Sequence, residues 1–264
     1  MKLGICCDGL NDETKIKNIA KAGFTFIESG LCGMSTASEG VMDTFGELLD
    51  KYGLYCRSTN GMFPSDIKLI GNNIDTAKIE DYLYHVFEKT KKFNIEVCVL
   101  GSGRARTVPE GVDIEKAYDQ FAEVISETIA PIIERYHKTL AIEPLRYCEC
   151  NIVNTVADSM KVVKAVNKPN VKTLIDYFHV GMNGEDINTF VNYQGDIKHV
   201  HIASPSNMRK FPSPDDGDDY QAFFDILRKA KYQDECISIE GDGGNSDSEF
   251  LQSLITSYHL LSKL

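Results

Sequence analysis

The segment Val171-Lys-Thr-Leu-Ile-Asp176 is a mainly apolar run that closes on a carboxylate, and three other segments repeat this pattern. They are Thr139-Leu-Ala-Ile-Glu143, Ile197-Lys-His-Val-His201 and Cys236-Ile-Ser-Ile-Glu240. Short runs rich in Ile, Val and Leu are typical of buried β-strands, whose interiors rarely carry charge. Four successive strands that each close on a metal-ligand type of residue are hard to explain by chance.

Strand-like and helix-like segments alternate along the whole chain. The apolar runs lie at roughly 2–7, 24–29, 54–59, 95–101, 139–143, 171–176, 197–203 and 236–241. Amphipathic stretches lie between them at roughly 11–22, 40–52, 75–93, 113–136, 154–167, 185–193, 218–231 and 246–263. Eight strand–helix pairs in 264 residues give about 33 residues per unit, a normal size for a βα repeat.

This alternation predicts an α/β fold, a single (β/α)8 TIM barrel that spans residues 1–264 as one domain. An open, doubly wound sheet is the structural alternative, but eight regular units with a shared ligand set favour closure. In a closed barrel the carboxyl ends of the strands converge on one mouth, where active sites lie.

Local signals agree with this organisation. Gly23 and Gly53 precede strands and are suited to left-handed helix ends. Pro131 is expected to kink the helix over 113–136 or to start a second one. The longest irregular stretches all follow predicted strands and are expected to build a pocket; they are 30–39, 60–74 and 203–217.

Composition limits the classes of function. The net charge of −11 disfavours binding to phosphate backbones, so nucleic acid is not an expected partner. No apolar stretch approaches the roughly 20 residues of a membrane helix. The segment Met1–Asp8 runs directly into a strand and lacks the layout of a signal peptide. None of the eight cysteines forms a CxxC pair, so we expect a reduced, cytoplasmic protein.

The four strand-end residues predict a divalent-metal site built from Glu143, Asp176, His201 and Glu240. Three hard carboxylate donors with one imidazole suit Mn²⁺ best, with Mg²⁺ or Co²⁺ also accommodated. Zn²⁺ can replace them because it binds such donors more tightly.

Neighbouring residues extend the predicted site. His179 follows Asp176 by three positions, Glu149 lies in the loop after Glu143, and Arg209 lies in the loop after His201. Each is a candidate for binding substrate, and each has the ordinary alternative of a solvated side chain. His199 shares a strand face with His201 and is expected one layer deeper.

At these residues the chain resembles the xylose isomerase-like TIM-barrel superfamily of sugar phosphate isomerases and epimerases. The resemblance is carried by Ala141-Ile-Glu-Pro-Leu-Arg-Tyr-Cys-Glu149, Leu174-Ile-Asp-Tyr-Phe-His179, His199-Val-His-Ile202 and Ile237-Ser-Ile-Glu-Gly241. These segments are similar to strands of ketose 3-epimerases and hydroxypyruvate isomerase. The alternation covers the whole chain, whereas the specific motifs lie in its second half.

The resemblance implies that Glu143, Asp176, His201 and Glu240 bind the metal and that Glu143 and Glu240 are also the catalytic pair. It implies substrate contacts for His179 and Glu149, a small carbohydrate as substrate, and it leaves homo-oligomerisation open. The family's usual arginine falls at Asn207 here, and Arg209 comes two residues later.

The predicted reaction is proton abstraction next to a sugar carbonyl through a metal-stabilised enediolate. Return of the proton to the opposite face inverts the carbon, whereas return to the neighbouring carbon isomerises the sugar. Three alternatives stay open: a dehydratase of a keto-inositol or related polyol, a sugar-binding protein without turnover, and an endonuclease IV-like enzyme. The nuclease is disfavoured because the early strands lack the extra His ligands of a zinc cluster.

The loop at 101–110 is a further departure from the family pattern. It is Gly-rich and contains Arg104 and Arg106. Such a loop is a weak match to an anion-binding segment, and a flexible, solvated turn is the usual alternative.

Overall fold

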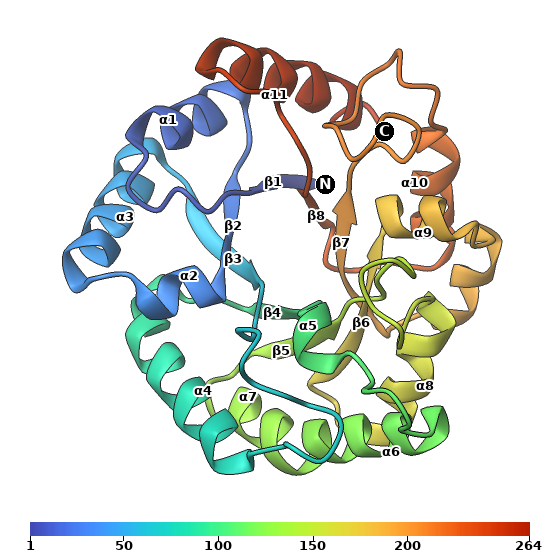
Figure 1. The fold of residues 1–264 in the computed structure, drawn as a ribbon. Helices are drawn as coiled ribbons and strands as arrows, with labels where there is room; N and C mark the ends of the chain where they lie inside the picture. Colours follow the sequence, from blue (N-terminus) through green and yellow to red (C-terminus); the bar gives the residue numbers. More distant parts are fainter.

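The computed structural model describes residues 1–264 as a closed barrel of eight parallel strands in sequence order, with the first strand paired to the last (Figure 1). The strands are β1 (Lys2–Cys6), β2 (Phe26–Gly30), β3 (Tyr55–Asn60), β4 (Val97–Leu100), β5 (Thr139–Ile142), β6 (Val171–Asp176), β7 (Ile197–Ile202) and β8 (Cys236–Ile239). The predicted (β/α)8 barrel is therefore confirmed.

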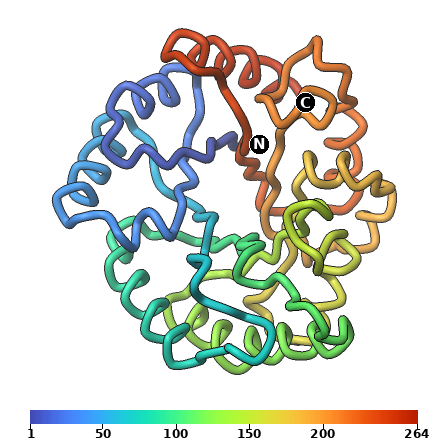
Figure 2. The backbone as a smooth tube through the Cα atoms, in the orientation of Figure 1, coloured from blue at the N-terminus to red at the C-terminus, as the bar shows by residue number.

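Helices form an outer ring around the strands, as the backbone trace also shows (Figure 2). They are α1 (Glu13–Ala22), α3 (Glu39–Tyr52), α4 (Thr76–Thr90), η1 (Lys91–Phe93), α6 (Ile114–Val124), η2 (Ile125–Ile129), α7 (Ala130–Arg135), α8 (Val156–Val166), η3 (Ile187–Tyr193), α10 (Tyr220–Lys229) and α11 (Asp247–Leu261). No helix among them has both the length and the apolar character needed to cross a bilayer.

The predicted strands agree with the observed ones to within a few residues. The predicted helix ends and the predicted helix break are also observed. Gly23 and Gly53 end α1 and α3 with left-handed φ angles of 105° and 67°. The long helix ahead of β5 is interrupted at η2, a π-helical turn, and α7 begins at Ala130 beside Pro131.

Several expected loops and one expected helix differ in the structure. The stretch 30–39 is not irregular, because it contains the short helix α2 (Leu31–Thr36). The stretch 101–110 contains α5 (Gly103–Arg106), and α9 (Tyr177–Asn183) follows directly on β6. Within the predicted helix 185–193, the residues Ile187–Tyr193 form the 3₁₀ helix η3 instead of an α-helix.

The alternation of strand side chains separates two environments. Most buried apolar residues form one cluster of 72, whereas Val97, Val99, Ala141 and Leu174 form a separate cluster. Successive strand residues point to opposite faces, so the small cluster lines the barrel interior. Glu143 and Asp176 lie two residues beyond Ala141 and Leu174 and therefore also point inward, one layer closer to the mouth.

Candidate metal centre

The barrel brings the four predicted ligands together. Asp176 is the last residue of β6 and is paired in register with His201 of β7, while Glu143 and Glu240 directly follow β5 and β8. One donor atom from each of the four residues lies within 4.8 Å of the others. The first and last of the four residues, Glu143 and Glu240, are 97 positions apart in the chain and yet lie close together.

Asp176 shows that this volume fits a cation. Its Oδ1 accepts a hydrogen bond of 2.8 Å from the amide of Phe178 and so caps α9. Its Oδ2 is buried and has no hydrogen-bond partner. A buried carboxylate oxygen without a hydrogen bond is costly, and the nearby groups, His179 Nε2 at 3.3 Å and Arg209 Nη2 at 3.7 Å, do not form one. A divalent ion held by the four residues would satisfy that oxygen.

His201 faces the carboxylates with one specific nitrogen. Its Nδ1 lies 3.1 Å from Glu143 Oε1 and 3.2 Å from Glu240 Oε2. The ring is fully buried. Nδ1 is therefore the nitrogen that would bind an ion shared with the two glutamates.

The pKa values of the clustered residues are shifted because several carboxylates are buried close together. Burial raises the pKa of Glu143, and the charge of Glu240 raises it further. Burial also acts to raise the pKa of Glu240, but His201 and Arg209 outweigh it and lower that pKa to about 2. For His201, burial lowers the pKa, yet Glu28 and Glu240 raise it well above its usual value. A bound cation would relieve this repulsion between carboxylates.

The predicted substrate residues surround the same cluster. Arg209 lies 2.6 Å from Glu240 Oε2 and 3.7 Å from Glu149 Oε1. It reaches them because Met208 and Arg209 both adopt left-handed φ angles, 53° and 66°, which turn the loop inward. The guanidinium carbon also lies 4.9 Å from the ring centre of Phe178, within cation–π range.

His179 is buried, so it is not a solvated surface histidine. Its Nδ1 accepts from the amide of Arg146 at 3.3 Å, and its Nε2 lies 3.3 Å from Asp176 Oδ2. Glu149 is half-buried and forms an ion pair of 2.5 Å with Arg146. His179 therefore contacts a proposed ligand directly, whereas Glu149 is linked to the cluster through Arg209.

The reading of 101–110 as an anion-binding loop is wrong for Arg106. This side chain is fully buried, and its Nη2 donates a 2.6 Å hydrogen bond to the carbonyl of Glu143. Arg106 thus holds the backbone of a predicted ligand from within the protein. Arg104 remains exposed.

Two residues near the cluster were missed from the sequence. Glu28 in β2 is fully buried beside His201, and Asn60 at the end of β3 donates a 3.0 Å hydrogen bond to Glu240 Oε1. The available signal for Glu28 was a lone charged residue inside the apolar run 24–29. His199, which was expected one layer deeper than His201, is fully buried and contacts Glu28 at 2.7 Å.

Comparisons with known proteins identify a matching family and several similar barrels. A family model described as Xylose isomerase-like TIM barrel matches residues 16–254. D-psicose 3-epimerase of Agrobacterium fabrum is 25% identical over 201 residues, which cover 74% of this chain and 68% of that relative. A probable ketose 3-epimerase of Synechocystis is 28% identical over 104 residues, 39% of this chain and 33% of that relative.

Solved structures share the fold at lower identity. D-psicose 3-epimerase of Clostridium cellulolyticum H10 with D-tagatose superposes with a TM-score of 0.81 at 17% identity and covers 99% of each chain. The 3-keto-D-glucoside 4-epimerase of E. coli superposes with a TM-score of 0.79 at 16% identity and covers 100% of each chain.

Proposed function

The chain belongs to the Xylose isomerase-like TIM barrel family, and from this premise we propose that it is a divalent-metal-dependent sugar epimerase or isomerase. The observation that carries the proposal is the convergence of Glu143, Asp176, His201 and Glu240 at the barrel mouth. The similarity to ketose 3-epimerases supports a sugar as the substrate.

The four residues would hold the ion through three carboxylate oxygens and Nδ1 of His201. Mn²⁺ is the expected ion, since the donor set is mainly hard oxygen. When bound, such an ion polarises a carbonyl oxygen and neutralises negative charge that develops on it.

Glu143 and Glu240 are the proposed proton-transfer pair. They follow β5 and β8, strands on different sides of the mouth, so a sugar lying across it has one carboxylate near each face. One glutamate removes the proton next to the carbonyl, and the other returns a proton to the opposite face. The carbon is thereby inverted, which is the outcome of an epimerase.

The rim residues would orient the sugar. Arg209 carries donors that match the oxygens of a polyol or carbonyl group. His179 presents Nε2 toward Asp176 because Nδ1 already accepts from the backbone of Arg146. We propose that His179 donates to a reacting oxygen and that Glu149 accepts from a sugar hydroxyl.

Substitution of the two glutamates tests the scheme. Glu143→Gln and Glu240→Gln should each lower turnover of an active ketose by about 100- to 10,000-fold, the usual contribution of a positioned acid or base. Glu185→Gln, which removes a carboxylate outside the site, should retain turnover. Full activity in both single variants would contradict the two-carboxylate scheme.

The reaction type is tested on a panel of ketoses, keto-inositols and keto-glycosides with Mn²⁺ in D₂O. The ion is removed by a chelator before proton NMR spectra are recorded. Deuterium at the carbon next to the carbonyl, with a new stereoisomer or aldose, supports the proposal. A product that has lost water would identify a dehydratase instead, and binding without exchange would identify a sugar-binding protein.

A further inference from the structure

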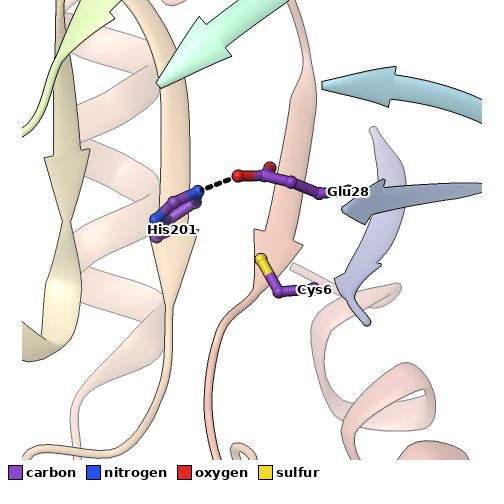
Figure 3. Close-up of side chains that lie close together, drawn as sticks. All are labelled: Cys6, Glu28 and His201. Carbon is purple, nitrogen blue, oxygen red and sulfur yellow. Dashed lines mark hydrogen bonds and ion pairs between the residues drawn. The ribbon is translucent and has the colours of Figure 1, made fainter. Parts of the chain in front are cut away.

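Glu28 lies inside the barrel directly behind the proposed metal ligand His201 (Figure 3). It belongs to β2, and its side chain is fully buried. It is not one of the four proposed ligands. A fully buried carboxylate is costly unless donors surround it, so its neighbours indicate what it does.

Every hydrogen-bond partner of the Glu28 carboxylate is a donor group. Oε2 accepts from Ser58 Oγ at 2.7 Å and from Ser238 Oγ at 2.8 Å, and His199 Nε2 lies 2.7 Å away. Oε1 is left for His201, whose Nε2 lies 2.8 Å away. The partners come from β3, β7 and β8, so the carboxylate is held on three sides and has little freedom to rotate.

This fixed carboxylate decides which nitrogen of His201 carries a proton. An ionised carboxylate only accepts, so Nε2 must be the N–H that points to Oε1. In a neutral imidazole the other nitrogen then keeps its lone pair. That nitrogen is Nδ1, which faces Glu143 and Glu240.

We propose that Glu28 is a positioning residue of the metal centre, which locks His201 in the Nε2-protonated form and aims Nδ1 at the ion. The inference rests on the metal site of the proposed function, and it concerns ion binding before any sugar arrives. Carboxylates behind metal-bound histidines commonly strengthen binding by about 10- to 100-fold.

A competing explanation is that Glu28 is itself a metal ligand. The Cys6 sulfur, Glu28 and His201 lie close enough together to form a second, three-residue ligand set (Figure 3). Both oxygens of Glu28 are already occupied by donors, however, and Oε1 would have to release His201 to bind an ion. The geometry therefore favours orientation of His201 over a second site. Cys6→Ala is the variant that separates the two explanations.

The affinity test uses the whole protein, stripped of metal and titrated with Mn²⁺ alone by calorimetry. Glu28→Gln should weaken binding by about 10- to 100-fold, while Cys6→Ala should bind as the unaltered protein does. Circular dichroism of the metal-free variants checks that the barrel is folded. Unchanged affinity in a folded Glu28→Gln variant, or equal weakening in Cys6→Ala, would overturn the inference.

A second measurement does not depend on whether a variant folds. The unaltered protein is labelled with ¹⁵N-histidine and loaded with diamagnetic Zn²⁺. NMR should show His201 with a proton on Nε2 and a metal-shifted Nδ1. A metal-bound Nε2 would refute the inference.

The outcomes also separate this inference from the proposed function. Tight Mn²⁺ binding with the Nε2–H form, but no sugar turnover, would remove the enzyme assignment and leave the role of Glu28 intact. Tight binding that is indifferent to Glu28 would remove only this inference. Failure of the unaltered protein to bind any divalent ion would overturn both.

Discussion

At the scale of single residues, the position of each carboxylate depends on neighbours that make room for it. Gly101 follows β4, and a Cβ atom placed there would lie 2.2 Å from Glu143 Oε2 and 3.3 Å from its Cδ. Carbon and oxygen atoms do not approach to 2.2 Å without a bond. A side chain at position 101 would therefore push the Glu143 carboxylate out of its place.

Gly101→Ala is expected to displace the Glu143 carboxylate and lower turnover by about 100-fold, because small misplacements in an active site have effects of that size. Mn²⁺ affinity should fall as well. The matched control is Gly33→Ala in α2, where an added Cβ meets nothing within 4 Å. Assays of turnover and calorimetry on both variants check the prediction, and normal activity in Gly101→Ala would contradict it.

At the scale of elements, the helices are tied to one another by side chains that cap them. Glu185 follows α9, and its Oε2 accepts a 2.9 Å hydrogen bond from the amide of Val156 at the start of α8. Its Oε1 is buried without a partner. Burial raises the pKa of Glu185 from 4.5 to about 7, because the charged form loses solvation.

This pKa makes stability depend on pH. The folded state binds the proton more tightly than the unfolded state, so Glu185 favours folding at acidic pH. That contribution is lost as the pH rises from about 4.5 through about 7. Glu185→Gln should therefore melt higher than the unaltered protein well above pH 7, and the difference should vanish near pH 4.5.

The expected size of this effect is modest. Glu185 is partly exposed, and solvent screening reduces the cost of its charge. We expect about 1 kcal/mol, which corresponds to about 2–4 °C in melting temperature for a chain of this length. Thermal unfolding of the metal-free proteins across this pH range measures it. An equal difference at both ends of the range would show that Glu185 does not titrate as proposed.

At the scale of the whole molecule, the proposed metal site joins strands that close the barrel. Its four residues come from β5, β6, β7 and β8, and the last of these pairs with β1. Two strands separate β5 from β8, so their ligands meet only when the sheet is curved into the barrel. An ion that binds them therefore binds the folded state and stabilises it by mass action.

Removal of metal by a chelator should abolish turnover and lower the melting temperature. At an ion concentration about 100 times the dissociation constant, the bound ion contributes about 2.7 kcal/mol. Asp176→Asn removes one proposed ligand without removing the helix cap, since Asn is also a good cap and preserves the start of α9. That variant should lose the metal-dependent stabilisation, and a chelator without effect on the unaltered protein would refute the site.

The amino-acid sequence by itself determined the order of the elements and the ligand types at the ends of the strands. Strand and helix periods are local properties, so all eight strands and most helices could be read from neighbouring residues. For example, the sequence predicts a strand that ends at Asp176, and β6 does end there in the structure.

Only the tertiary structure decided which distant residues meet. Glu28 lies 173 positions from His201 in the chain, and only closure and register of the barrel place its Oε1 beside Nε2. The inward course of Arg106 and the left-handed turn that carries Arg209 to Glu240 likewise depend on contacts between separate loops. Such contacts follow from three-dimensional packing, which leaves no periodic signal in the sequence.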